Sequence, residues 1–150
     1  GRILYASNGD ELKAFNIRDG LGIKLLQKAG VQVAIITGRC SPMVERRARE
    51  LGISHVIQGR EDKRVALREL AADAGIELAH CAYMGDDLPD LGAIRAAGLG
   101  MTVGDAADAV TRAADWQSNA PGGHGAVREA CEFLLQARGV LADMEEAFES

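Results

Sequence analysis

The stretch VQVAIITGRCSPMVERRARELG, residues 31–52, contains one complete strand-and-helix unit. Val31–Thr37 is rich in β-branched residues, which predicts a strand. Ser41–Gly52 carries the marks of a helix: a serine cap, a proline at the first helical position and a closing glycine. A strand followed by a helix is the repeating unit of parallel α/β sheets.

The same unit recurs on both sides of this stretch. Before it, Asp19–Gly30 predicts an amphipathic helix that is capped by Asp19 and ended by Gly30. After it, strands are predicted at His55–Gln58, Cys81–Gly85, Leu99–Val103 and Asp115–Ser118, and helices at Asp62–Gly75, Leu88–Gly98, Asp105–Ala114 and Gly125–Gly139. The alternation predicts an α/β fold: a Rossmann-like parallel sheet with helices on both faces.

The two ends of the chain differ from this pattern. Residues from about 2 to 15 predict a β-hairpin around the turn Asn8-Gly9. Its apolar residues need burial, either against a neighbouring subunit or against the chain's own sheet: Ile3, Leu4, Tyr5, Leu12 and Phe15. Residues 140–150 predict an acidic, mobile tail.

The composition predicts a single domain over residues 1–150, since 47% of them are hydrophobic and 26% are charged. The net charge is −5 and no run of Lys or Arg exceeds two residues, which argues against a nucleic-acid partner. No apolar stretch reaches the roughly 18 residues that a membrane span needs. The widely spaced Cys40, Cys81 and Cys131 indicate free thiols in a reducing cytoplasm rather than a zinc site.

Polar residues gather where the predicted strands end. They are Thr37-Gly38-Arg39, residues 58–63 with Lys63, the pair Asp86-Asp87, and the glycine-rich residues 120–126. Because ligands bind at the carboxyl ends of parallel strands, these groups predict one site, whose hydroxyl, lysine and carboxylates suit a phosphate with a divalent cation. Each residue also has a structural alternative: Thr37 ends a strand, Lys63 is a solvated lysine, and Asp87 or Asp90 caps the helix that begins at Leu88.

These residues resemble the haloacid dehalogenase superfamily of phosphohydrolases, with Thr37-Gly38, Lys63 and GDDLPD (85–90) matching its second, third and fourth motifs. Six segments in order are more closely similar to the 3-deoxy-D-manno-octulosonate 8-phosphate (KDO 8-phosphate) phosphatase family. They are AFNIRDGLGIKLL (14–26), AIITGR (34–39), VERRARELGI (44–53), QGREDK (58–63), AYMGDDLPDL (82–91) and APGGHGAVRE (120–129).

The resemblance implies a cytoplasmic, Mg²⁺-dependent phosphatase that releases KDO and phosphate in lipopolysaccharide biosynthesis. It implies a homotetramer in which hairpins assemble centrally and a neighbouring subunit completes each substrate site. Thr37 and Lys63 would hold the phosphoryl group, and Asp86 would bind the metal with Asp87 and Asp90 supporting it. The implied substrate-binding residues are Asn16, Ile17, Arg18, Asp19, Gly20, Lys24, Arg39, Arg47 and Lys63.

The arginines bear on the choice of substrate. Arg binds carboxylates bidentately, so Arg39 and Arg47 suit a sugar acid. In the related phosphatases of the nine-carbon sugar acid, the position of Arg39 is typically acidic, so Arg39 favours the eight-carbon acid. A related sugar-acid 9-phosphate phosphatase remains the alternative substrate assignment.

The family's first motif, D-x-D-G-V-x-T-D, is absent from this sequence, and Gly1 aligns with the glycine after it. That motif follows a central strand and carries the aspartate nucleophile and the aspartate general acid/base. The sequence as given is therefore expected to be inactive alone, with two unpaired strand edges in its sheet. This absence favours one alternative, a non-catalytic oligomerisation or binding module of the same fold. A phospho-receiver domain fits less well, because there the acidic pair precedes the threonine and lysine.

Overall fold

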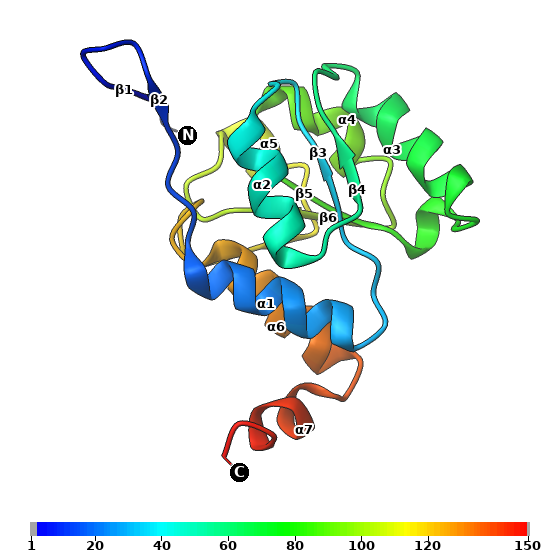
Figure 1. Ribbon diagram of the computed structural model, residues 1–150. Coiled ribbons are helices and arrows are strands. Elements are labelled where there is room, and N and C mark those ends of the chain that lie inside the picture. The colour runs from blue at the N-terminus through cyan, green and yellow to red at the C-terminus, as the bar shows by residue number, and fades with distance from the viewer. Residues whose placement is uncertain (1–2, 150) are drawn as a thin grey trace.

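The predicted alternation of strands and helices is confirmed in the computed structural model, which describes residues 3–149 (Figure 1). Gly1, Arg2 and Ser150, at the outer ends of the predicted hairpin and tail, lie outside the described residues. The elements are β1 (Leu4–Tyr5), β2 (Glu11–Leu12), α1 (Ile17–Lys28), β3 (Ala34–Ile36), α2 (Pro42–Leu51), β4 (His55–Ile57), α3 (Lys63–Asp73), η1 (Leu78–His80), β5 (Ala82–Gly85), η2 (Leu88–Asp90), α4 (Leu91–Ile94), β6 (Leu99–Thr102), α5 (Asp108–Thr111), β7 (Trp116–Gln117), α6 (Ala126–Ala137) and α7 (Leu141–Glu146), where η marks a 3₁₀ turn.

The parallel strands form two groups. β3 pairs with β4, with Ile35 opposite Val56. β6 pairs with both β5 and β7, with Met101 opposite Met84 on one side and Trp116 on the other. Within residues 3–149 no strand is hydrogen-bonded to the second edge of β3 or to the second edge of β5. The parallel direction is as predicted, but the strands are divided between two sheets.

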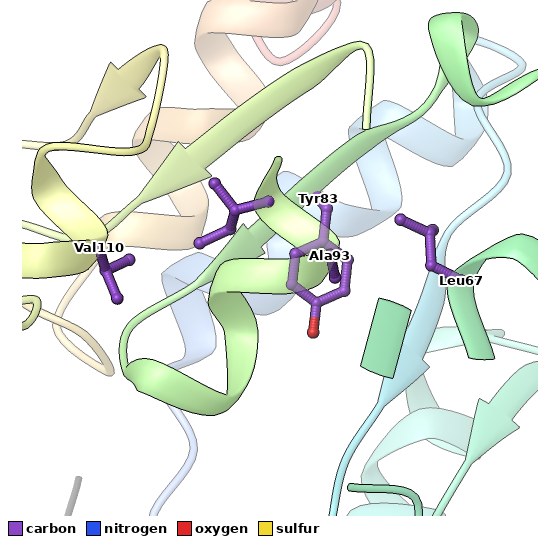
Figure 2. Packing of buried hydrophobic residues seen from close by; sticks show 5 residues of the cluster. Leu67, Tyr83, Ala93 and Val110 are labelled. Atoms are coloured by element: carbon purple, nitrogen blue, oxygen red, sulfur yellow. The ribbon is translucent and has the colours of Figure 1, made fainter. Parts of the chain in front are cut away.

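The two sheets share a core although they are not hydrogen-bonded to each other. Leu67, Tyr83, Ala93, Ile94 and Val110 form one buried cluster, and Ile36 of β3 packs against it. Figure 2 shows Tyr83 and Ala93 lying between Leu67 of α3 and Val110 of α5. β3 and β5 therefore contribute to the same buried cluster.

Helices cover both faces of β3, as the alternation predicts. Ile35 packs in a second cluster with Ala48 and Leu51 of α2, whereas Ile36 packs against the first cluster with α3 and α4. Successive residues of a strand point to opposite faces, so the two isoleucines mark two helical layers. Helices α1 and α6 lie side by side in Figure 1, with Leu25 and Leu135 in one buried cluster, and Ile23 of α1 also packs against the α2 cluster.

The beginning of α1 differs from the prediction. Its N-cap is Asn16 and not Asp19, because Asn16 Oδ1 accepts hydrogen bonds from the N–H groups of Arg18 at 2.8 Å and Asp19 at 3.3 Å. Asp19 is buried, and its Oδ1 accepts a hydrogen bond from Arg128 N–H at 2.9 Å in the first turn of α6. The residue that was predicted to cap its own helix instead stabilises the start of another.

The predicted helix over Leu88–Gly98 is also shorter than expected. Residues 88–90 form a 3₁₀ turn, and α4 covers only Leu91–Ile94. Asp87 caps this turn and Pro89 lies two residues after it. Together they start a tight turn before the helix begins. The chain then turns at Gly98, whose N–H donates to the carbonyl oxygen of Leu78 at 2.7 Å.

The two chain ends correct two further predictions. Large apolar side chains of the hairpin are exposed, including Leu4 at 52% and Tyr5 at 68%, so burial against the chain's own sheet is wrong. In Figure 1 the hairpin projects away from the body. The predicted mobile tail instead contains the helix α7, because Leu141 and Met144 pack against the cluster between α1 and α6.

Gly98 lies against the backbone of Ala79, and its replacement tests this close contact. A Cβ at this position would overlap the backbone carbonyl of Ala79, which cannot swing aside as a side chain can. We expect Gly98→Ala to lower the free energy of unfolding by about 3 kcal/mol in urea titrations. Gly122→Ala is the matched control, because its Cβ would make only ordinary contacts at 3.6 Å. Equal stabilities for the two variants would contradict the packing described for Gly98.

Candidate active site

Asp90 connects β5 to α3 through four hydrogen bonds. Its Oδ1 accepts hydrogen bonds from Lys63 Nζ at 2.7 Å and from the Tyr83 hydroxyl at 2.9 Å. Its Oδ2 accepts from the N–H groups of Asp86 at 3.1 Å and Asp87 at 3.3 Å. Four donors occupy the acceptor positions of a carboxylate, so Asp90 supports its neighbours and is not available to a cation.

The loop after β5 can fold back onto Asp90 because Gly85 has no side chain. A Cβ on Gly85 would overlap the Cβ and the carboxyl carbon of Asp90. The Gly85 carbonyl oxygen accepts a hydrogen bond from the buried hydroxyl of Thr102 at 2.7 Å, which fixes the end of the strand. Asp87 Oδ1 accepts from Leu88 N–H at 2.8 Å, so the expected capping role is confirmed for Asp87.

Asp86 is the member of this aspartate cluster that remains open to a ligand. It is the first residue after β5 and is exposed. No Lys or Arg among residues 3–149 forms an ion pair with its carboxylate. Its carbonyl oxygen accepts a hydrogen bond from Ala107 N–H at 3.0 Å, so the loop after β6 is attached beside it.

Thr37 lies one residue beyond β3 and is tied to the loop that leads to Lys63. Its N–H donates to the Ile57 carbonyl oxygen at 2.9 Å, and its own carbonyl oxygen accepts from Arg60 N–H at 3.1 Å. Its Oγ1 accepts from Arg39 N–H at 3.2 Å. A Cβ on Gly38 would overlap the carboxylate of Glu61, so that acidic side chain lies over the Thr37-Gly38 turn.

Lys63 is the first residue of α3, and the loop before it is held by ion pairs. Arg60 Nε contacts Asp62 Oδ1 at 2.6 Å and Arg60 Nη1 contacts Glu69 Oε2 at 2.9 Å. The Lys63 side chain is only 16% exposed and points to Asp90 rather than to solvent. The alternative of a solvated surface lysine is therefore wrong.

The electrostatics keep Asp90 ionised. Burial opposes ionisation of Asp90, but the hydrogen bonds from Lys63 and Tyr83 outweigh burial and lower the pKa of this carboxyl below its usual value. Burial raises the pKa of Tyr83, and the charge of Asp90 raises it further, so the hydroxyl keeps its proton and donates. The site therefore contains a buried, ionised carboxylate that holds the Lys63 ammonium in place.

This ionisation predicts a pH dependence of stability. Because the pKa of Asp90 is lower in the folded state than in the unfolded state, its stabilising effect is fully present above the unfolded value of about 4. The effect is lost as the pH falls through the folded pKa. We expect the difference in unfolding free energy between the wild type and Asp90→Asn to shrink as the pH is lowered from 6 toward 2. Urea titrations at each pH measure this difference, and a difference that grows toward low pH would contradict it.

Most of the predicted substrate residues lie on or beside α1. Asn16, Asp19 and Gly20 lie at the start of α1, where the Arg47 guanidinium lies against Gly20 and contacts Glu50 Oε2 at 3.2 Å. Ile17, Arg18 and Lys24 are exposed on the same helix. An open cleft of about 270 Å³ lies beside this helix start, lined by Lys13, Phe15, Met43, Arg46, Arg47 and Glu50.

Arg39 is paired with the hairpin. Its Nη2 is 3.2 Å from Glu11 Oε2, and Glu11 Oε1 is 2.8 Å from Lys13 Nζ. Sequence reasoning missed Glu11 and Tyr83 as members of the site. Tyr83 and Gly85 are two residues apart on β5 and so lie on the same face of the strand. Because Asp90 folds back against Gly85, this spacing is the one sequence signal for the contact between Tyr83 and Asp90.

The side chains at the strand ends can supply part of a magnesium site. Mg²⁺ is commonly held by one or two carboxylates together with water and a substrate phosphate. Asp86 supplies one exposed carboxylate at the strand end, with Lys63 and Thr37 on the neighbouring segments. Residues 3–149 contain no cluster of three or more His, Cys, Asp or Glu side chains that could hold a metal by itself.

Comparison with known proteins identifies the family of the chain. Residues 55–128, which include Lys63 and the aspartate cluster, match the model of the haloacid dehalogenase-like hydrolase family. The 3-deoxy-D-manno-octulosonate 8-phosphate phosphatase of Escherichia coli (strain K12) is 44% identical over 141 residues, which are 94% of this chain and 75% of that protein. The chain belongs to the 3-deoxy-D-manno-octulosonate 8-phosphate phosphatase family. Its members are hydrolases of phosphate monoesters within the haloacid dehalogenase superfamily.

Solved structures of this family share the fold. The phosphatase from Moraxella catarrhalis, determined with magnesium, phosphate and KDO, is 51% identical and superposes with a TM-score of 0.96 over 99% of this chain and 85% of that one. The cobalt-bound phosphatase from Haemophilus influenzae is 40% identical, with a TM-score of 0.94 over 100% and 89% of the two chains.

Two further observations concern the cysteines and the length of the helices. Cys40, Cys81 and Cys131 are free cysteines, as the wide spacing predicts. None of the helices within residues 3–149 is long and apolar enough to cross a membrane.

Proposed function

We propose that this chain, together with a strand that carries the motif D-x-D-G-V-x-T-D, acts as a Mg²⁺-dependent phosphatase that hydrolyses 3-deoxy-D-manno-octulosonate 8-phosphate to KDO and phosphate in lipopolysaccharide biosynthesis. The observation that carries the proposal is the buried Lys63–Asp90 pair, because the carboxylate that holds the Lys63 ammonium also accepts the backbone N–H of the exposed Asp86. An ammonium, a hydroxyl and a carboxylate at one sheet edge match the charges of a phosphoryl group and its cation.

The residues have distinct roles in this proposal. Lys63 Nζ and Thr37 Oγ1 bind the phosphoryl oxygens, where charge develops during transfer. Asp86 holds Mg²⁺, and bound Mg²⁺ neutralises the phosphate charge and orients it for in-line attack. Asp90 and Asp87 keep Lys63 and the loop in position through the hydrogen bonds described above.

The nucleophile in this proposal belongs to a strand between β3 and β5. Each of these neighbouring strands has an edge with no strand partner within residues 3–149, and both end at the candidate site. A strand in this gap, followed by the motif D-x-D-G-V-x-T-D, would place its first aspartate beside Lys63 and Asp86. This aspartate would take the phosphoryl group, and the second would protonate the leaving sugar oxygen and then activate water.

The substrate's sugar acid is bound by residues outside the phosphate site. In this proposal Arg39 and Arg47 bind the carboxylate and neighbouring hydroxyls, since a guanidinium matches a carboxylate bidentately. Asn16, Ile17, Arg18, Asp19, Gly20 and Lys24 form the remaining wall. Asn16 and Asp19 do so mainly through the backbone they fix, because their side-chain oxygens already accept hydrogen bonds within the protein.

The decisive experiment compares two forms of the protein. The first is this chain, and the second, the completed enzyme, is this chain preceded by a strand and the motif D-x-D-G-V-x-T-D. We expect the completed enzyme to release phosphate from KDO 8-phosphate with Mg²⁺, and to prefer it over a nine-carbon sugar-acid 9-phosphate. The same protein with N-x-N in place of D-x-D is the control. Absence of phosphate release from the completed enzyme would refute the proposed function.

The assembly that we propose is a cytoplasmic homotetramer formed through the hairpin. The exposed apolar side chains of β1, β2 and the segment up to Ile17, itself 80% exposed, form a surface that a neighbouring subunit would cover. The three free thiols fit a reducing compartment. Sedimentation at micromolar concentration is expected to give a tetramer, and a monomer would refute the assembly. Fractionation of producing cells tests the compartment.

A further inference from the structure

Glu11 of the hairpin lies between two cations at the edge of the candidate site. Its Oε2 is 3.2 Å from Arg39 Nη2, and its Oε1, which is buried, is 2.8 Å from Lys13 Nζ. Arg39 follows β3 in the chain, 28 residues away from Glu11. One carboxylate thus joins the hairpin to the loop that carries Thr37.

We propose that Glu11 is a positioning residue: it orients Arg39 and Lys13 so that their remaining donors bind the substrate's carboxylate. This inference rests on the proposed function, because it concerns how the sugar acid is recognised. It makes the hairpin part of the substrate site and not only a surface for assembly.

The geometry leaves Arg39 able to bind a second carboxylate. Within residues 3–149, Glu11 is its one acidic partner, and the contact uses Nη2. A guanidinium has five N–H donors, so the opposite edge can still form a bidentate pair. The backbone N–H of Arg39 is also fixed, by its hydrogen bond to Thr37 Oγ1 at 3.2 Å. The backbone of Arg39 is therefore held by Thr37, and its guanidinium is held by Glu11.

The charge balance favours an anionic ligand. Two cations share one carboxylate, which leaves the group Glu11, Lys13 and Arg39 with one net positive charge. The adjacent ammonium of Lys13, with Arg39 acting in the same direction, holds the pKa of Glu11 below its usual value, so the carboxylate stays ionised. Lys13 also lines the cleft of about 270 Å³ that contains Arg47. The cleft therefore connects this charged group to the second predicted sugar-acid residue.

A contribution to stability does not account for the ion pair between Glu11 and Arg39. The Arg39 side chain is 53% exposed, and ion pairs with this much exposure contribute little to folding. A free arginine side chain has many rotamers and loses them when it binds a ligand. A carboxylate that removes this freedom in advance strengthens ligand binding by preorganisation.

The test measures phosphate release by the completed enzyme from two substrates, KDO 8-phosphate and p-nitrophenyl phosphate, which has no carboxylate. We expect Glu11→Gln to raise KM for KDO 8-phosphate by about tenfold, with kcat for both substrates and KM for p-nitrophenyl phosphate nearly unchanged. Asp10→Asn is the matched control, because Asp10 lies on the same hairpin and, within residues 3–149, its side chain is hydrogen-bonded only to Asn8. This control should behave as the wild type.

A double-substitution cycle separates positioning from general damage. If Glu11 acts through Arg39, adding Glu11→Gln to Arg39→Gln should cause little further rise in KM. An unchanged KM for KDO 8-phosphate in Glu11→Gln would overturn the inference, as would equal losses with both substrates. A lower KM would also overturn it, since Glu11 would then compete with the substrate for Arg39. If the completed enzyme without substitutions releases phosphate from neither substrate, the proposed function itself fails.

Discussion

Replacing Asp86 with alanine in the completed enzyme is expected to abolish Mg²⁺-dependent phosphate release, with kcat falling by about a thousandfold or more. Asp86 is exposed at the end of β5, and its carboxylate is not committed to an ion pair within residues 3–149. Loss of this carboxylate removes a ligand of the cation that neutralises the substrate phosphate. The measurement is phosphate release from KDO 8-phosphate across a range of Mg²⁺ concentrations.

The neighbouring aspartate provides the control for this result. Asp87 has the same charge, but its carboxylate accepts the N–H of Leu88 and caps the turn η2. Asp87→Ala is therefore expected to lower turnover by less than about tenfold, through loosening of the loop. If Asp86→Ala keeps wild-type turnover and Mg²⁺ dependence, the metal assignment is wrong.

Replacing Asp90 with alanine is expected to lower the free energy of unfolding by about 3–5 kcal/mol. The change leaves the mostly buried ammonium of Lys63 without its acidic partner, and it removes the acceptor of the Tyr83 hydroxyl and of two backbone N–H groups. Unpaired buried charges are among the costliest defects in a protein interior. Urea titration of this chain at neutral pH measures the effect.

Tyr83→Phe gives a scale for that measurement. It removes one hydrogen bond to Asp90 and keeps the aromatic ring in the buried cluster. Its expected cost is about 1 kcal/mol. A loss of stability in Asp90→Ala no larger than in Tyr83→Phe would mean that Lys63 finds another partner, and the role of Asp90 would have to be revised.

Much of the fold was predictable because its signals are local. The β-branched run ending at Thr37, the proline at the start of α2 and the left-handed Gly52 at its end each depend on neighbouring residues. The capping of α1 was predicted wrongly, because Asn16 and Asp19 are equally good caps by type. The choice between them depends on α6, whose Arg128 N–H attracts the carboxylate of Asp19. A contact across 109 residues leaves no local signal.

The candidate site shows the same division. Thr37, Lys63 and Asp86 were predicted because strand ends converge in any parallel sheet. The resemblance proposed Asp90 as a supporting residue, but its four partners depend on how η2 folds back onto β5. Glu11 was missed because the β1–β2 hairpin and the Arg39 loop meet only in the folded chain.

The docking of α1 against α6 affects how the chain folds as it is made. Leu25 and Leu26 are covered by Cys131 and Leu135, and the Asp19–Arg128 hydrogen bond spans 109 residues. At a synthesis rate of roughly 5–20 residues per second, α1 emerges about 5–20 seconds before its partner helix. During that interval its apolar face is open to the solvent and to chaperones, because this helix layer cannot close before α6 has been made.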